Sequence, residues 1–432
     1  MLEYLKINKI LFYLAGGLFI LLAFYLTSQS YNGSQVIRWG TESGLYHDNA
    51  KKVLTGQTPF FDYFVEYPPL VPYLLTIPAF LTFNFDLNGA IYIFVYPLLM
   101  MILSFGVYFY LLREKWKSNV FWIVGFGINF LIGASYIITR YDFYPTITCF
   151  LGILFYIQSL DNSNDKTNKN FIISVIFLAL SIFLKVYALF PLILITILSY
   201  KNWLRLKIIF VVLALFSLVQ APFVFTKNFS KFVEYQTTSR DAQLESTYAG
   251  ISLLTEKITN SDTTNLVGQN GSMELNDTFS KNLSKLSTYV VLILAVLPIC
   301  IFGYRELKAN KFKQLTNLNT DKIIYLSFAI ILGVLVSSKI FSPQYWFWIL
   351  GMIPLLAFVK ENNKLQKLQN ILLILAFTTV TYMTYWIWPV NYGQLMDKEI
   401  FAIGVLNVRN LLVLIIYFYF LFKTFYTPKS YE

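Results

Sequence analysis

The chain has 432 residues, of which 56% are hydrophobic and only 13% are charged. A soluble domain carries about 25% charged residues, so this composition excludes an ordinary water-soluble protein and indicates lipid as a second solvent. The net charge of +11 does not indicate nucleic acid, because the positive residues lie in short islands between apolar runs rather than in one basic domain.

Apolar runs long enough to cross a bilayer recur along the chain, since a span needs about 20 apolar residues. Such runs lie at 9–27, 88–112, 120–138, 208–224, 286–303, 322–338, 370–387 and 404–422, with shorter ones at 143–159 and 344–358. The run 171–199 contains Lys185 near its middle, so we expect two short spans that meet at this lysine. The stretch 70–83 predicts a short interfacial helix. Because backbone polar groups must be satisfied inside lipid, residues 1–432 are predicted to form one all-α, polytopic domain with about twelve transmembrane helices.

The lysines and arginines between the runs predict an orientation. Most of them lie in short islands and tails, which the positive-inside rule places in the cytoplasm together with both termini. Six polar segments then fall on the outer face: 28–69, Arg140 to Asp142, Lys185, 225–285, Lys339 to Gln344 and 388–403. Ionisable residues near lipid are costly and are functional candidates by default, so we expect one outward-facing site. For any single residue a structural role is the alternative, such as an ion pair of Arg140 with Asp142 or snorkelling of Lys185 to the interface.

The first outer segment is unusually polar for this chain. It carries four acids and the only histidine: Glu42, His47, Asp48, Asp62 and Glu66. The pattern predicts an amphipathic helix over 43–54 that ends at Gly56, and a second helix that begins at Pro68-Pro69, since proline is tolerated in a first turn. The apolar face of the first helix is expected to carry Leu45, Val53 and Leu54.

Six motifs in chain order carry a resemblance to a known family. In the first loop, an acid, a tyrosine, an alanine, a glycine and an aromatic residue precede the sequence EYPPL, at Glu42, Tyr46, Ala50, Gly56, Phe60 and 66–70. The other five motifs are RYDFYP at 140–145, LKVYALFPL at 184–192, SRDAQLESTYA at 239–249, FSPQY at 341–345 and NVRNLL at 407–412. Together they resemble the polyprenyl-phosphate-mannose-dependent α-mannosyltransferases, a branch of the GT-C glycosyltransferases.

The resemblance implies a GT-C fold and an inverting transfer of a hexose, with mannose as the family default. The donor would be a polyprenyl-phosphate sugar, and the acceptor a hydroxyl of a lipid or glycan at the outer face of the plasma (cytoplasmic) membrane. The family's first-loop acid is taken as the catalytic base and is usually aspartate. The matching residue here is Glu42, which departs from that pattern, and Asp48 is the alternative base.

The predicted site residues follow from the chemistry of this reaction. A carboxylate must accept the acceptor proton, and cations must stabilise the departing phosphate. The predicted phosphate ligands are Arg240, Lys185, Arg140, Lys339 and His47. The predicted sugar or acceptor contacts are Asp142, Gln243, Glu245, Gln344, Tyr46, Glu66 and Tyr67. An alternative for Arg240 is a pair with Glu245 or Asp241 that holds its loop down. We expect deletion of residues 261–271 of that loop to be far milder than loss of Arg240.

The sequence contains no metal-ligand spacing, no phosphate-binding loop and no dinucleotide fingerprint. We therefore expect no metal, no cofactor and no nucleotide donor; the expected partners are the lipid-linked donor, the acceptor and membrane lipids. Two other functions stay open. One is a transporter that flips a lipid-linked sugar, which an internal repeat would favour, although none is found. The other is a non-catalytic relative that binds prenyl lipids, which the substitution at Glu42 leaves open.

Overall fold

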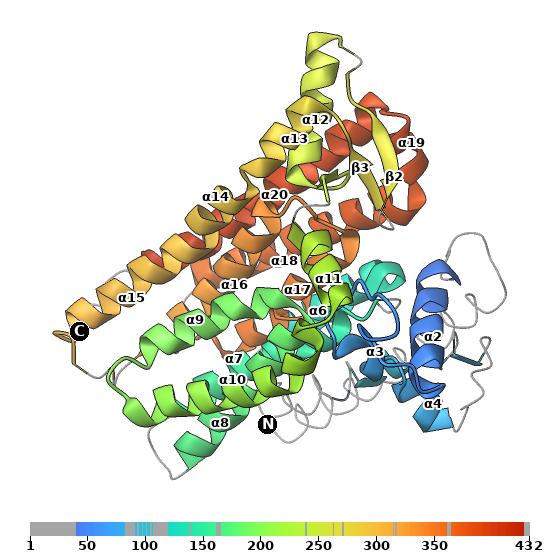
Figure 1. Ribbon diagram of the computed structural model, residues 1–432. Helices are drawn as coiled ribbons and strands as arrows, with labels where there is room; N and C mark the ends of the chain where they lie inside the picture. The colour runs from blue at the N-terminus through green and yellow to red at the C-terminus, as the bar shows by residue number, and fades with distance from the viewer. Residues whose placement is uncertain are drawn as a thin grey trace, which may run out of the picture.

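A computed structural model of the protein describes most of the chain. The described residues are 40–82, 91–92, 95–96, 98–100, 102–103, 106, 120–137, 140–160, 166–237, 240–261, 263–269, 272–313, 315, 318–360 and 364–426. They are mostly helical, and their strands form one small sheet (Figure 1). The predicted spans at 9–27 and 88–112 lie wholly or largely outside these residues.

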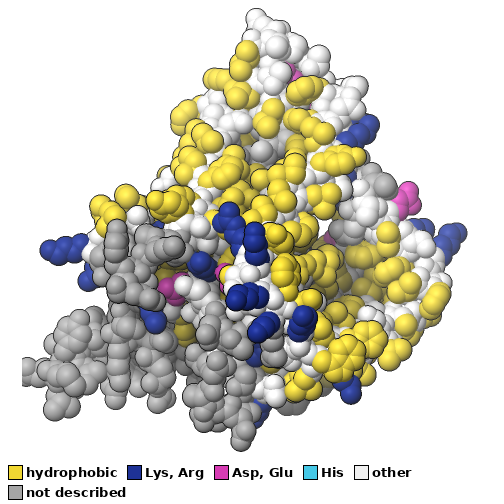
Figure 2. Space-filling view, turned by 90° about the vertical axis from the view of Figure 1, so that its left-hand side faces the viewer, with side chains coloured by type: hydrophobic (Ala, Val, Ile, Leu, Met, Phe, Trp, Pro, Cys, Tyr) yellow, Lys and Arg dark blue, Asp and Glu magenta, His cyan; other side chains and the backbone are white. Residues whose placement is uncertain are grey.

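Within the described ranges, five helical segments are long and apolar enough to cross a membrane. They are Trp203–Val224, Thr278–Ala309, Thr320–Ser337, Lys364–Val390 and Ile400–Phe425. Shorter apolar helices accompany them at Val71–Leu81, Val124–Ala134, Phe143–Gln158, Asn168–Leu184, Val186–Leu198 and Pro343–Phe358. Hydrophobic side chains also cover much of the face shown in Figure 2. The helical, membrane-type architecture is thus confirmed, while the number of twelve spans stays a prediction.

The first described helix, α2 (Gly40–Leu54), agrees with the helix predicted over 43–54. It ends just before Gly56, whose φ of +88° is a conformation that glycine adopts at little steric cost. Within the protein the helix buries Tyr46, Asn49 and Ala50 and leaves Leu45 exposed. The tertiary contacts select this buried face, since the Tyr46 ring packs against surrounding tyrosines. The apolar face predicted for Leu45, Val53 and Leu54 stays a prediction.

Helical structure follows Pro68-Pro69 as predicted, but as two short helices in place of the single helix expected. They are α3 (Val71–Leu74) and α4 (Ile77–Thr82). The next helical group comprises α6 (Val120–Ile137), α7 (Phe143–Gln158), α8 (Lys166–Leu184), η1 (Val186–Ala188), α9 (Leu189–Leu198) and α10 (Trp203–Val224). The helices α7 and α8 approach closely at Gly152, whose carbonyl oxygen accepts a 2.6 Å hydrogen bond from the Ser174 hydroxyl.

The chain breaks at Lys185, where two short spans were expected to meet. Helix α8 ends at Leu184, Lys185 is extended with φ −163° and ψ 125°, and the turn η1 leads into α9. The prediction that the run 171–199 forms two helices is therefore confirmed. The break leaves the Lys185 side chain at a corner of the fold rather than in the middle of a helix.

The segment after α10 is more ordered than the sequence predicts. It contains α11 (Lys227–Thr237), β1 (Ala242–Gln243), α12 (Thr247–Thr259), β2 (Leu266–Gln269), β3 (Ser272–Leu275) and α13 (Thr278–Lys285). Strand β3 lies between β1 and β2 in an antiparallel sheet. Strand β2 falls within 261–271 and pairs with β3, which argues against the mild effect expected for deleting this stretch.

The remaining helices form the C-terminal part of the bundle. They are α14 (Ser287–Val291), η2 (Leu292–Val296), α15 (Leu297–Ala309), α16 (Thr320–Ser337), η3 (Pro343–Trp346), α17 (Phe347–Leu350), η4 (Ile353–Phe358), α18 (Lys364–Tyr385), η5 (Trp386–Val390), α19 (Tyr392–Met396) and α20 (Ile400–Phe425). Helix α16 is almost entirely buried and packs against α20. Figure 1 shows the sheet, α12 and α19 together at one end of the molecule.

Candidate functional site

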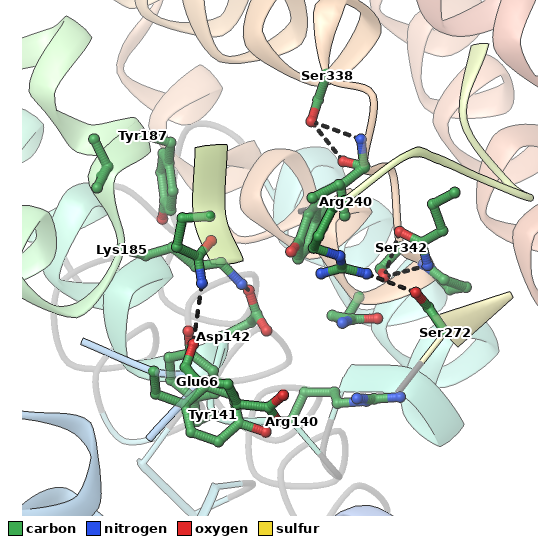
Figure 3. Close-up of a pocket in the computed structure, with 18 of the residues that line it drawn as sticks. Glu66, Arg140, Tyr141, Asp142, Lys185, Tyr187, Arg240, Ser272, Ser338 and Ser342 are labelled. Atoms are coloured by element: carbon green, nitrogen blue, oxygen red, sulfur yellow. Dashed lines mark hydrogen bonds and ion pairs between the residues drawn. The ribbon is translucent and has the colours of Figure 1, made fainter. Parts of the chain in front are cut away.

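One cavity of about 1030 Å³ receives residues from all six polar segments that the sequence places on one face. From the N-terminal segments come Tyr46, Glu66, Tyr67, Arg140, Tyr141, Asp142 and Lys185. From the later segments come Arg240, Gln243, Glu245, Ser272, Ser342, Gln344, Tyr345, Trp348, Trp388 and Tyr392. Segments that are far apart in the chain therefore form one site, whose wall is shown in Figure 3.

Lys185 and Asp142 form a buried ion pair on this wall. The Lys185 ammonium donates to the Asp142 carboxylate, whose side chain is 3% exposed (Figure 3). The same carboxylate oxygen accepts a 2.9 Å hydrogen bond from the Trp348 indole. Asp142 thus pairs with Lys185, and the ion pair with Arg140 considered from the sequence is wrong.

Aromatic rings surround the Lys185 ammonium. Its nitrogen lies 4.1 Å from the ring centre of Tyr345, 5.1 Å from that of Tyr141 and 5.2 Å from that of Trp348. Such ring faces attract a cation, so they help to hold the ammonium at the cavity. This set of rings was not predicted from the sequence, although the aromatic run 345–348 directly after FSPQ was a signal for it.

Arg240 lines the cavity, but a buried carboxylate already engages it. Its Nε donates to Glu274 Oε1 at 2.9 Å, and its Nη2 donates to the Ser272 hydroxyl at 2.6 Å. Glu274 also accepts the backbone N–H of Asp241 at 2.9 Å and is fully buried in β3. The alternative partners predicted for Arg240, Glu245 and Asp241, are therefore wrong, because β3 brings Glu274 across the sheet.

Two further cations differ in their relation to the cavity. Arg140 lines it, with its guanidinium carbon 5.8 Å from the ring centre of Trp388. Lys339 does not line it; its ammonium donates to the backbone carbonyls of Arg240 at 2.6 Å and Thr237 at 3.2 Å. Burial lowers the pKa of Lys339. Lys339 thus binds the backbone of the loop that carries Arg240, which argues against its predicted contact with phosphate.

The residues predicted from α2 are only partly brought together. Tyr46 lines the cavity and its hydroxyl accepts the backbone N–H of Tyr141 at 3.3 Å. His47 and Asp48 contact each other at 3.4 Å, and the Asp48 side chain is 68% exposed. Neither of them lines the cavity, which argues against Asp48 as the base and His47 as a phosphate ligand. The side chain of Glu42 lies outside the described residues.

Glu66 and its neighbours connect the first loop to α11. The Tyr235 hydroxyl donates to Glu66 Oε2 at 3.1 Å, and the Gln236 amide donates to the Glu66 carbonyl at 3.0 Å. Burial, together with the Glu66 carboxylate, raises the pKa of Tyr235, which keeps its hydroxyl protonated as a donor. An apolar cluster around Phe60 and Phe232 packs the two segments together beside these bonds.

After Asp142, Glu245 is the most buried of the described carboxylates that line the cavity. It is 3% exposed, and burial raises its pKa to about 7, against the opposing effects of Arg409, Tyr392 and Arg140. Its Oε2 atom accepts no hydrogen bond from any described residue. The Arg409 guanidinium donates to the Glu245 backbone carbonyl at 2.5 Å. Arg409 lies in the NVRNLL motif, but no role was predicted for it from the sequence.

Amide side chains complete the wall. The Gln243 amide nitrogen lies 2.7 Å from the Ser342 hydroxyl oxygen, which joins β1 to the FSPQY segment. Gln344 lies in the first turn of η3, is largely buried, and lines the cavity. Within the described part of the chain, no group of three or more His, Cys, Asp or Glu side chains could hold a metal ion.

No protein-family model matches this sequence, and no curated protein matches it significantly. The family resemblance therefore rests on the six motifs.

Proposed function

We propose that the protein is an inverting glycosyltransferase that moves a hexose, with mannose as the first candidate, from a polyprenyl-phosphate donor to a hydroxyl of a lipid or glycan acceptor. We place the reaction at the outer face of the plasma membrane, in a GT-C fold of about twelve spans. The six motifs support the family, and the positive-inside pattern supports the side. The acceptor is defined here only by its hydroxyl group.

The observation that carries this proposal is the charge pattern of the cavity. Its cations are Lys185, Arg140 and Arg240, and its carboxylates are Glu66, Asp142 and Glu245. A volume of about 1030 Å³ is at the upper end of ordinary ligand sites. It therefore suits a hexose together with a phosphate and an acceptor hydroxyl rather than a single small ion.

The cations suit a departing phosphate. In the proposed reaction the acceptor oxygen attacks the anomeric carbon, and the bond from that carbon to the phosphate oxygen breaks. Negative charge then grows on the phosphate, and preorganised cations are most effective where charge develops. Lys185 is the principal candidate because the surrounding rings hold its ammonium at the cavity, and Arg140 offers a guanidinium on the same wall.

One part of the cavity lining is apolar, as an amphiphilic donor requires. Val186 and Phe190 from the η1–α9 corner contribute to it, together with Phe232 and Val233 from α11. Val186 is 61% exposed and Val233 is 42% exposed, so this edge opens to the surroundings. A prenyl chain would gain about 25 cal/mol for each Å² of apolar surface that it buries there.

The acceptor hydroxyl must pass its proton to a base as it attacks. The resemblance assigns the proton to Glu42, whose side chain lies outside the described residues, so that assignment stays a prediction. The polar groups Gln243, Gln344 and Tyr67 line the same cavity and are suited to hydrogen bonding with sugar or acceptor hydroxyls.

The decisive test is turnover of labelled polyprenyl-phosphate mannose by the purified protein in nanodiscs. We expect release of polyprenyl phosphate and, with a membrane-lipid extract as acceptor, a labelled lipid product. Lys185→Ala should weaken donor binding and turnover, whereas Lys51→Ala, which removes an exposed lysine of α2, should do neither. Binding without turnover would instead identify a non-catalytic prenyl-lipid-binding protein, and donor movement across a vesicle without cleavage would identify a transporter.

A further inference from the structure

The described carboxylates that line the cavity differ in how fully they are engaged. Asp142 is paired with Lys185 and accepts from an indole, so its charge is already compensated. Glu66 accepts from Tyr235 and belongs to the contact between the first loop and α11. Glu245 lines the cavity, is nearly completely buried, and its Oε2 accepts no hydrogen bond from a described residue.

We propose that Glu245 accepts the proton of the attacking acceptor hydroxyl, in place of Glu42, an inference that rests on the proposed glycosyl transfer. In this step the hydroxyl oxygen forms a bond to the anomeric carbon as its proton passes to Glu245. The bond between the anomeric carbon and the phosphate oxygen breaks, and polyprenyl phosphate leaves with that electron pair. No oxidant, reductant or further reactant is needed.

The backbone around Glu245 is fixed, as a base on a catalytic wall requires. The residue lies between β1 and α12, where the Ser246 hydroxyl caps α12 by accepting the Ala249 N–H at 3.1 Å. Arg409 of α20 donates to the Glu245 carbonyl, and the Asn410 amide donates to the Ser246 carbonyl at 3.3 Å. Arg409 does not touch the reacting groups in this arrangement and is a positioning residue.

The surroundings of the Glu245 carboxyl group bring its pKa close to neutrality, where a general base is effective. Burial raises its pKa to about 7, and three groups from other elements oppose that rise: Arg409 of α20, Tyr392 of α19 and Arg140 before α7. A general base is most effective when its pKa lies near the working pH, because it is then ionised and still basic. Such perturbed carboxyls concentrate at functional sites.

The first experiment compares three variants for turnover of labelled polyprenyl-phosphate mannose and for donor binding. Glu245→Gln should lower kcat by about 10²- to 10⁴-fold, the usual effect of losing a general base, with donor affinity within twofold of wild type. Glu42→Gln is the comparison at the residue to which the resemblance assigns the proton, and it should lower kcat less than Glu245→Gln does. Glu399→Gln, the same substitution at an exposed glutamate before α20, serves as the matched control.

The second readout is the pH profile, which a merely structural glutamate would not change. For the wild type, kcat/KM should rise with pH, reach half its maximum near pH 7 and level off above it. Glu245→Asp should keep a titrating limb at a shifted midpoint, so the test does not depend on the Gln variant folding. An inactive Glu42→Gln beside an active Glu245→Gln would overturn the assignment, as would a wild-type profile that is flat between pH 5 and 8. If the wild type shows no turnover, the glycosyl transfer itself fails; if it turns over and only these variants disagree, this inference alone fails.

Discussion

Arg240→Ala should destabilise the protein through the carboxylate that it leaves behind. In the wild type, Glu274 is fully buried and its Oε1 accepts from Arg240 at 2.9 Å. Removing one partner of a buried pair typically costs about 3–5 kcal/mol, because an uncompensated charge remains. The Ser272 hydroxyl and the Asp241 N–H still donate to Glu274 in the variant, so we expect about 3 kcal/mol, the lower end of that range.

Thermal unfolding in detergent separates this effect from donor recognition when a compensating variant is included. The double variant Arg240→Met/Glu274→Gln removes both charges and should recover most of the lost stability, since replacing a whole buried pair is often nearly neutral. Its donor affinity should stay low, because the guanidinium is still missing from the cavity wall. The unfolding temperature of Arg240→Lys should lie between those of Arg240→Ala and the wild type, since an ammonium cannot reproduce both contacts to Glu274 and Ser272.

Two results would refute this reasoning. An Arg240→Ala protein that unfolds at the wild-type temperature would show that the pair with Glu274 contributes nothing. Wild-type donor affinity in the stable double variant would show that Arg240 only holds the sheet together, and the phosphate contact would then fall to Lys185 and Arg140.

Three other outcomes are expected. Gly333→Ala should lower the unfolding temperature, because a Cβ there would lie 2.5 Å from a backbone carbonyl oxygen of η2. Such overpacking typically costs about 1–3 kcal/mol. Gly404→Ala, whose Cβ would have no neighbour within 4 Å, should not lower it, and equal effects of the two variants would contradict this helix contact. Because burial raises the pKa of Glu245 from 4.5 to about 7, its stabilising contribution should be present below pH 4.5 and be lost as pH rises through 7. That loss is about 3 kcal/mol at 1.36 kcal/mol per pH unit, and a pH titration of unfolding should show a flatter slope for Glu245→Gln. Asp142→Asn should tighten donor binding in a filter assay, because it removes the carboxylate that competes with phosphate for Lys185; weaker binding would argue against that lysine as a ligand.

Local patterns determined much of the fold. The apolar runs predict helices because lipid leaves backbone groups no other partner, and α10, α16, α18 and α20 each overlap one of the predicted runs. The break at Lys185 was predictable for a related reason, since a lysine is costly at the centre of a span. Gly56 and Pro68 marked the helix boundaries of the first loop through their own backbone geometry.

The sidedness of charge also predicted which segments would form the site. Counting lysines and arginines along the chain assigned six polar segments to one face, and the cavity is lined by residues from each of them. This inference needs only the order of spans and islands, so it did not require any knowledge of side-chain packing.

Only the tertiary structure decided which charges meet. Arg240 contacts Glu274 because β3 pairs with β1. No strong alternating pattern in 242–275 predicted this sheet. Lys185 finds Asp142 across 43 positions of sequence, and Arg409 reaches the Glu245 backbone across 164. Helix boundaries depend on neighbouring residues and the solvent, whereas the partner of a charge and the pKa of a buried carboxyl depend on atoms brought close by folding. The spacing of residues along the chain does not record those distances.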